Sequence, residues 1–365
     1  MAAEQTLWQR DWTVVPGEIL VEALEERGMS QSELARRMGR PTKTINEIAN
    51  GKAAITPETA IQLELTLGIS AAFWNNLEAS YRAQLARQRV DEELATHASW
   101  AMSFPIKDLV KNNLITTGET KASKVAALLR FFQVSNPEVW EKNWTTSATA
   151  YRRSPAFEAS PYASAAWLRW GEIIATGIET GPFDAERLHA VLGEIREMTR
   201  RDFAMTRPRI EELCASAGVA LVITPEFAGT HLSGAARWLA PDKAIIQLSL
   251  RHKADDQFWF SFFHEARHVL DRKKADHLDA DPSGAERKDD DPDEAEADRF
   301  ARDTLIPPNS YVEFVAGGDF SEEAIRDFAK RLNVAPGVVV GRLQRGGHVD
   351  RSHFRSLKRP IHPAG

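Results

Sequence analysis

The chain has 365 residues and a formal net charge of −6, with 43% hydrophobic and 27% charged residues. This balance is typical of a globular protein with a large core, and it excludes a polyanion binder whose whole surface is basic. The single cysteine, Cys214, excludes an intrachain disulfide and a zinc site made of thiolates. The sequence shows no signal peptide and no apolar run long enough to cross a bilayer, so we expect a cytoplasmic protein without membrane partners.

Residues 16–80 are divided into short helices by glycine, proline and serine. Ser30 caps a helix predicted over residues 31–38, since a glutamate follows three residues later as in a capping box. Gly39 begins a tight turn, after which a third helix is predicted over residues 42–50. Two short helices joined by a turn of three or four residues predict a helix-turn-helix unit.

The third helix is the predicted recognition helix for DNA. Residues 30–52 hold five basic and two acidic side chains, whereas the first helix is acidic, so the DNA-facing side is expected here. The alternative is a helical bundle that only mediates dimerisation. The candidate DNA contacts, chosen because their side chains can reach base edges or phosphates, are Arg40, Thr42, Lys43, Thr44, Asn46 and Lys52.

Over about residues 14–82 the chain resembles the XRE-type helix-turn-helix of HigA-like antitoxins. The resemblance implies a homodimeric repressor that binds a palindromic operator in double-stranded DNA. The segments that carry it are Pro16-Gly17-Glu18-Ile19-Leu20, Ser30-Gln31-Ser32-Glu33-Leu34-Ala35, Thr44-Ile45-Asn46-Glu47-Ile48, Asn50-Gly51-Lys52, Ile55-Thr56-Pro57-Glu58-Thr59-Ala60 and Ala72-Phe73-Trp74-Asn75-Asn76-Leu77.

The middle of the chain, residues 83–205, is predicted to be mostly helical and gives no indication of a function. Its aromatic residues fit a hydrophobic core better than a platform on which nucleic-acid bases stack. They are Trp140, Trp144, Phe157, Tyr162, Trp167 and Trp170.

Short β-branched runs begin near residue 219. Residues 219–224 are predicted as a strand, and residues 234–239 and 244–250 as two more, joined by a hairpin turn at residues 241–242. The last of these strands either holds an extended peptide along a free edge or is an ordinary strand of the sheet. The predicted fold class is therefore mainly α with a small β-sheet (α+β).

The sequence His-Glu-Ala-Arg-His at residues 264–268 is the most informative chemical motif of the chain. On a helix, His264 and His268 lie one turn apart and face the same way, so both imidazoles can reach one zinc ion. Glu265 is placed to act as a general base on a water molecule, and Asp271 is a candidate hydrogen-bond partner for the ligands. The alternative is a surface helix that carries two unrelated histidines.

A catalytic zinc site needs a third protein ligand, and a helix predicted over residues 294–305 supplies the candidates. Glu296 shares a helix face with Phe300, so an inward-facing phenylalanine would bring this carboxylate toward the first helix. A buried glutamate is costly unless it is paired or bound to a metal. Glu294 and Asp298 remain alternative ligands.

Residues 205–358 resemble the ImmA/IrrE metallopeptidases, whose fold is zincin-like. The resemblance implies the ligands His264, His268 and Glu296, with Glu265 as the catalytic acid/base. The family often has a glycine directly before the second histidine, where this chain has an arginine. The segments that carry the resemblance are Ile246-Gln247-Leu248-Ser249, the run from Phe258 to His268, the run from Glu294 to Ala301, Phe328-Ala329 and the run from Pro336 to Gln344.

Basic residues are concentrated between residues 342 and 359. Such a cluster can contact DNA or an acidic partner, but we favour a solvated tail. The cluster consists of Arg342, Arg345, Arg351, Arg355, Lys358 and Arg359.

Together these patterns predict a helix-turn-helix domain over residues 1–82, a helical region over residues 83–205 and a metallopeptidase domain over residues 206–365. We expect a DNA-binding regulator whose zinc-dependent endopeptidase domain cleaves a repressor- or antitoxin-like protein. Mn²⁺ or Fe²⁺ would fit the same nitrogen and oxygen ligands. The alternative is a non-proteolytic repressor or antitoxin whose metal site is structural or senses a ligand.

Overall fold

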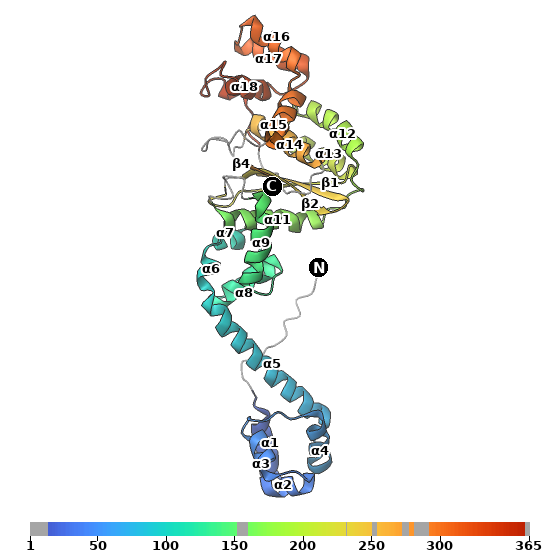
Figure 1. The fold of residues 1–365 in the computed structure, drawn as a ribbon, viewed down its shortest axis with the longest axis vertical. Coiled ribbons are helices and arrows are strands. Elements are labelled where there is room, and N and C mark those ends of the chain that lie inside the picture. Colours follow the sequence, from blue (N-terminus) through green and yellow to red (C-terminus); the bar gives the residue numbers. More distant parts are fainter. Residues whose placement is uncertain are drawn as a thin grey trace. The chain divides into compact units, whose positions relative to one another are not determined.

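The computed structural model describes residues 14–151, 160–230, 232–249, 254–271, 277–280 and 292–361, with the backbone alone at residues 145–151 and 277–280. The chain divides into two compact units, Met1–Ala98 with Thr120–Ser123 and Ser99–Glu119 with Lys124–Gly365 (Figure 1). The three predicted regions stay a prediction, although α5 (Ala71–Thr96) and α13 (Phe203–Ser216) each run across one of their boundaries.

The described part of the first unit is built from short helices followed by one long helix. Ser30 caps the second helix as predicted, since its hydroxyl accepts a hydrogen bond from the Glu33 amide at 3.1 Å. Gly39 ends that helix with a positive φ of 64°, which glycine adopts without strain. The helices are α1 (Pro16–Glu26), α2 (Gln31–Met38), α3 (Thr42–Ala49), α4 (Pro57–Leu67) and α5.

The core of this unit gathers one to three apolar residues from each helix. Leu20, Leu34, Ile45, Leu63 and Trp74 are all fully buried in it. Because each helix buries only one stripe, the opposite stripe of α3 stays in contact with solvent. This is the arrangement that the sequence pattern predicts for a helix-turn-helix.

Gly17 lets α1 approach the end of α3 closely. A Cβ atom at this position would overlap the backbone carbonyl oxygens of Ile48 and Ala49. Backbone atoms cannot rotate away as a side chain can, so any larger residue would push the two helices apart. Gly17 therefore helps to fix the position of α3.

The second unit begins with helices that enclose an aromatic core. Trp100, Phe104, Phe132 and Trp140 are buried, and the rings of Trp140 and Tyr162 stack with their centroids 5.2 Å apart. This packing confirms the interpretation of these aromatic residues as core, while Phe157 lies outside the described residues. The helices are α6 (Ala98–Met102), α7 (Ile106–Lys111), α8 (Lys121–Phe132) and α9 (Pro137–Tyr151).

A small sheet forms the centre of the second unit. Its strands are β1 (Val219–Thr224), β2 (Leu232–Ala240), β3 (Lys243–Ser249) and β4 (His277–Ala280), in the order β1-β3-β2-β4. β3 pairs in parallel with β1 and antiparallel with β2. Because β3 is paired on both sides, the idea that it offers a free edge to a peptide is wrong, and it is an inner strand.

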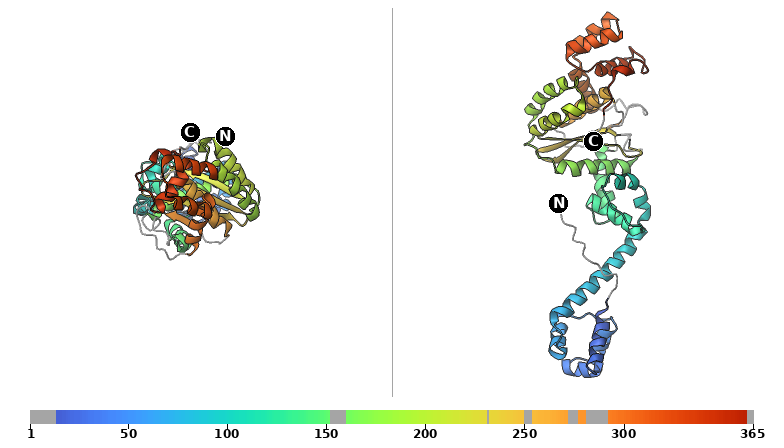
Figure 2. Two further views of the ribbon diagram at one scale, coloured as in Figure 1. Left: turned by 90° about the horizontal axis from the view of Figure 1, so that it is seen from above. Right: turned by 180° about the vertical axis from the view of Figure 1, so that it is seen from behind.

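The sheet lies between two layers of helices (Figure 2), and alternate residues of β3 contact different layers. The buried Gln247 donates a hydrogen bond to the carbonyl oxygen of Trp167 in α11 (Pro161–Thr176) at 2.8 Å. Ile246 and Leu248 belong instead to the core shared with α12 (Ala185–Met198), α13 and α14 (Asp255–Leu270). The sheet is thus covered on both faces, and the fold class is mainly α with a small β-sheet, as predicted.

The C-terminal helices are α15 (Pro292–Leu305), α16 (Pro308–Gly317), α17 (Glu322–Leu332) and α18 (Pro336–Arg345), followed by a 3₁₀ turn at Arg355–Leu357. α15 and α18 pack on α14, and α17 packs on α18. Among the described residues, no helix is both long and apolar enough to span a membrane.

Lys358 and Arg359 are not part of a solvated tail, which corrects the prediction for these two residues, whereas Arg351 and Arg355 of the same cluster are exposed. Lys358 Nζ donates to Asp256 Oδ2 at 2.6 Å. The Arg359 amide donates to Asp255 Oδ1 at 3.1 Å, and its guanidinium lies 3.3 Å from the other oxygen. Asp255 and Asp256 are the first two residues of α14, so Lys358 and Arg359 hold the N-terminal end of this helix in place.

Candidate metal centre and nucleic-acid interface

α14 holds the histidine pair inside the protein. His264 and Glu265 are fully buried, and His268 is 2% exposed. The Nε2 atoms of the two histidines lie 3.1 Å apart. The one-turn spacing in the sequence therefore brings both imidazoles to one point, as predicted, and the alternative of two unrelated histidines on a surface helix does not apply.

Glu294 from α15 completes the cluster. Its Oε2 lies 3.2 Å from His264 Nε2, and its Oε1 lies 3.4 Å from His268 Nε2. All three ligand atoms lie within 4.8 Å of one another. Ligands at about 2.0–2.1 Å from a tetrahedral zinc ion would be about 3.3 Å apart, so these three residues fit a divalent metal in both chemistry and spacing.

Glu296, the preferred third ligand in the sequence prediction, lies elsewhere in the structure. Its side chain is 39% exposed and its Oε2 lies 2.6 Å from Arg299. The buried stripe of α15 runs through Ala297, Ala301 and Leu305 rather than through Phe300. This rotation of the helix brings Glu294 to the histidines and turns Glu296 toward neighbouring arginines, so we correct the choice to Glu294.

Asp298 supports the cluster from one turn further along α15. Its Oδ1 lies 2.9 Å from Nδ1 of His264. A carboxylate at Nδ1 fixes the ring orientation and leaves Nε2 directed at the metal position. The sequence prediction treated Asp298 as a possible ligand, and the structure places it behind a ligand instead.

Glu265 lies against the backbone of β2. A Cβ atom at Gly234 would come 2.7 Å from Oε1 and 2.8 Å from Cγ of this glutamate, so only glycine leaves room for it. Gly234 was not among the predicted site residues, although a glycine inside a predicted strand indicates a close approach. The glutamate is thus held between the sheet and its own helix.

Two further residues near the motif pair with each other. Arg267 lies 2.8 Å from Asp271, and it also contacts the ring of Phe300. Asp271 was expected to support a ligand, but the described contacts place it on Arg267. The arginine that replaces the glycine of the resembling family is therefore held by α14 and α15.

The candidate DNA contacts lie around α3. Thr42, Lys43, Asn46 and Lys52 are exposed, whereas Thr44 is half-buried. The side chain of Lys43 is 85% exposed and lies 3.8 Å from Glu47 in an ion pair. The exposed stripe of α3 thus consists of polar side chains that can reach a groove.

Arg40 and Gln31 modify the predicted set of DNA contacts. The half-buried Arg40 donates to Gln62 Oε1 at 2.5 Å, so its guanidinium is tied to α4. Gln31 was not predicted, and its Oε1 accepts a hydrogen bond from Asn46 Nδ2 at 3.2 Å. This contact extends the polar surface from α3 to the first residue of α2.

Comparison with known proteins locates relatives of the first unit. The helix-turn-helix family model matches residues 20–74. The uncharacterized HTH-type transcriptional regulator YddM of Escherichia coli (strain K12) is 40% identical over 76 residues, which are 21% of this chain and 81% of that protein. Antitoxin HigA-1 of Vibrio cholerae is 36% identical over 78 residues, which are 21% of this chain and 73% of that protein.

Solved structures also match a short part of the chain. The Pseudomonas aeruginosa antitoxin HigA with the higBA promoter has 32% sequence identity and a TM-score of 0.22, and covers 22% of this chain and 90% of that chain. The HigA-family addiction module antidote protein of Coxiella burnetii has 34% identity and the same TM-score of 0.22, covering 22% of this chain.

Proposed function

Because this chain belongs to the helix-turn-helix family of HigA-like regulators, we propose that its first unit binds operator DNA with α3 in the major groove. The exposed polar stripe of α3 supports the proposal most directly. Lys43 and Lys52 would contact phosphates, and Asn46 would contact a base edge. The residues that anchor α3, Ile45 and Ile48, are buried and leave this stripe fixed in direction.

The DNA proposal is tested with single substitutions on α3. We expect Lys43→Ala to weaken binding to all sequences and Asn46→Ala to cost about 1–3 kcal/mol of preference for the operator. Arg87→Ala, an exposed arginine of α5, is the matched control. The probe is the DNA upstream of the coding sequence, followed by fluorescence anisotropy at two salt concentrations. Equal binding by all four proteins would contradict the assignment of α3.

We also propose that the regulator acts as a homodimer. Ile61 and Leu65 lie one turn apart on α4 and are 54% and 80% exposed, which is unusual for neighbouring large apolar residues. A dimer would match a palindromic operator. Sedimentation should show a dimer for the wild type and a monomer for Leu65→Glu, whereas a wild-type monomer at micromolar concentration would contradict the proposal.

For the second unit we propose a zinc-dependent endopeptidase that cleaves a repressor- or antitoxin-like protein. His264, His268 and Glu294 would hold the metal, for which Mn²⁺ or Fe²⁺ are alternatives. When bound, zinc would polarise the scissile carbonyl and lower the pKa of a water molecule toward neutrality. The resemblance to ImmA/IrrE metallopeptidases and the position of Glu265 support this chemistry.

Residues of the chain would carry the proton and position the reacting groups. The Glu265 carboxylate would accept a proton from the attacking water and deliver it to the leaving amine nitrogen as the carbon–nitrogen bond breaks. Gly234 keeps that carboxylate beside β2, and Asp298 keeps His264 in one orientation. The buried carboxylate of Glu265 is the observation on which the enzymatic proposal depends.

Glu265→Gln tests this proposal because it keeps the shape of the side chain and removes the proton carrier. Zinc-loaded wild type and variant are incubated with a lysate of the host cell, and new protein N-termini are identified by mass spectrometry. We expect cleavage products with the wild type alone, while zinc and DNA binding are equal in the two proteins. The same products from both would contradict the proposal.

The burial of both imidazoles also suits a repressor or antitoxin whose metal is structural or senses a ligand. That function needs no carboxylate beside the metal. Under it, zinc removal would change DNA binding or stability, and wild type and Glu265→Gln would behave alike.

A further inference from the structure

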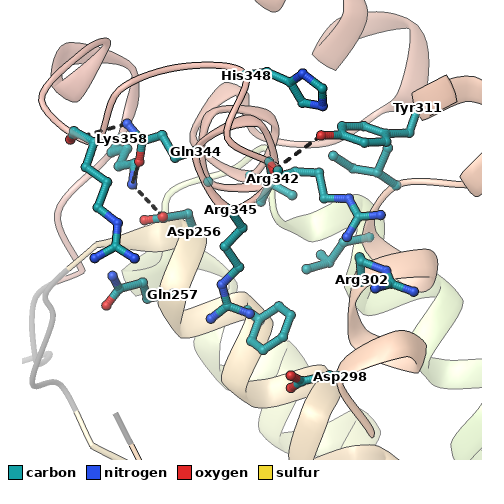
Figure 3. Close-up of a pocket in the computed structure, with 17 residues that line it drawn as sticks. Asp256, Gln257, Asp298, Arg302, Tyr311, Arg342, Gln344, Arg345, His348 and Lys358 are labelled. Carbon is teal, nitrogen blue, oxygen red and sulfur yellow. Dashed lines mark hydrogen bonds and ion pairs between the residues drawn. The ribbon is translucent and has the colours of Figure 1, made fainter. Parts of the chain in front are cut away.

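A basic pocket of about 610 Å³ lies in the second unit among α14, α15, α16 and α18 (Figure 3). Its volume is in the range of about 300–1,000 Å³ that is usual for small-molecule sites. Five cationic side chains line it against the two carboxylates of Asp256 and Asp298, although the chain as a whole has a net charge of −6. The cations are Arg302, Arg342, Arg345, Arg351 and Lys358.

Arg342 is the clearest sign that the pocket is built for an anion. The side chain is half-buried, and burial lowers the pKa of its guanidinium, with a further lowering by the neighbouring Arg302. Its buried Nε–H has no hydrogen-bond acceptor in the part of the chain that the structure describes. A buried donor on a cation is costly unless an acceptor reaches it, and an anionic oxygen in the pocket would supply one.

The guanidinium groups of two of the arginines lie over aromatic rings. The Arg342 guanidinium carbon lies 4.5 Å from the centre of the Tyr311 ring, and that of Arg345 lies 3.7 Å from the centre of the Phe260 ring. Stacking uses the face of a guanidinium and leaves its in-plane N–H groups able to donate. Lys358 differs, because its ammonium is already paired with Asp256 at 2.6 Å.

We propose that this pocket binds a small molecule that carries a phosphate group. An excess of three positive charges on the wall favours a multiply charged phosphate over a single carboxylate, and guanidinium groups match phosphate oxygens in pairs. The pocket is too small for a nucleic-acid duplex or a folded protein. Because Asp298 lines the pocket and also contacts His264, the occupant would lie beside the candidate metal centre. The inference does not depend on peptidase activity.

Inorganic pyrophosphate is the probe, added to the full-length protein at low ionic strength and followed by isothermal titration calorimetry. We expect saturable binding that Arg342→Gln weakens at least tenfold and Arg345→Gln weakens in the same direction. Arg331→Gln is the matched control, since this exposed arginine also stacks on an aromatic ring, Phe328, but lies outside the pocket. Its binding should equal that of the wild type.

Several results would overturn the proposal. One is the absence of binding up to about 10 mM pyrophosphate. Another is equal affinity in the wild type and both pocket variants. Tighter binding of hexaglutamate than of pyrophosphate would assign the pocket to an acidic peptide instead. Circular dichroism shows whether each variant folds, and the exposed Arg345 provides the test should Arg342→Gln unfold.

Discussion

The helices that carry the two candidate functions, α3 and α14, place their chemistry in opposite surroundings. In α3 the side chains with a proposed role, such as Lys43 and Asn46, face solvent. In α14, His264 and Glu265 are fully buried, and each depends on a residue from another element. Both helices could be singled out from residue types along the chain, but the third member of the buried cluster, Glu294, is defined by what packs against α14.

The largest effect is expected at the buried site. His264→Ala should weaken zinc binding more than about 100-fold, because loss of even an outer partner of a ligand costs about 10–100-fold. His353→Ala, an exposed histidine, is the control. Metal content after dialysis measures the difference. An equal zinc content in both variants would contradict the role of His264 as a ligand in a buried metal centre.

The pKa values of two carboxylates, Asp255 in α14 and Glu33 in α2, are shifted in opposite directions. Burial raises the pKa of Asp255 to about 6, although the Arg359 guanidinium opposes the shift. The exposed Glu33 instead has a lowered pKa, because Arg37 and Arg36 donate hydrogen bonds to it.

The raised pKa of Asp255 gives a signed prediction for stability. The folded protein holds the Asp255 proton more tightly than the unfolded chain does. The stabilisation of the folded state by this proton is therefore present in full well below about pH 4 and is lost as the pH rises through about 6. We expect the free energy of unfolding of the wild type, relative to that of Asp255→Asn, to fall by about 2 kcal/mol between about pH 4 and about pH 6, out of about 3 kcal/mol over the whole titration. Urea titrations across this range measure it, and a difference that rises with pH would contradict the burial argument.

α3 also depends on one buried contact, at Gly17. Gly17→Ala should destabilise the first unit by about 1–3 kcal/mol, because the added carbon overlaps backbone oxygens at the end of α3. Gly193→Ala is the matched control, since nothing lies near a Cβ atom there and alanine favours a helix. Hydrogen exchange of α1 and α3 should speed up in the first variant alone. Unchanged exchange would show that the two helices can separate without cost.

A smaller effect on zinc affinity is expected at Asp298, which contacts the ligand His264 rather than the metal position. Asp298→Asn should reduce zinc affinity by about 10-fold, because the amide holds the His264 ring less firmly and adds no charge. Competition with a zinc chelator measures the change. An affinity equal to that of the wild type would mean that the ring is oriented by other contacts.

The sequence was sufficient for features that depend on local order. The predicted second helix, residues 31–38, has the bounds observed for α2, because its cap and its glycine stop are both local signals. The pairing of His264 with His268 follows from helix geometry alone. The small sheet was also predicted as a hairpin of two strands after a first strand.

Features that depend on distant parts of the chain were not predictable. The choice of Glu294 over Glu296 depends on how α15 is rotated by the burial of Ala297 and Ala301. The inner position of β3 depends on pairing with β1 across a long connection. Arg359 is fixed by a carboxylate more than a hundred residues earlier. No periodicity along the sequence contains this information.

Zinc titration of the wild type, Glu294→Gln and Glu296→Gln tests the buried centre most directly. Glu294→Gln should weaken zinc binding at least about 10-fold, since it removes an anionic ligand that lies 3.2 Å from His264 and 3.4 Å from His268. Glu296→Gln should bind zinc as the wild type does, because its carboxylate is occupied by Arg299. Normal binding by Glu294→Gln together with loss in Glu296→Gln would contradict the metal centre described above.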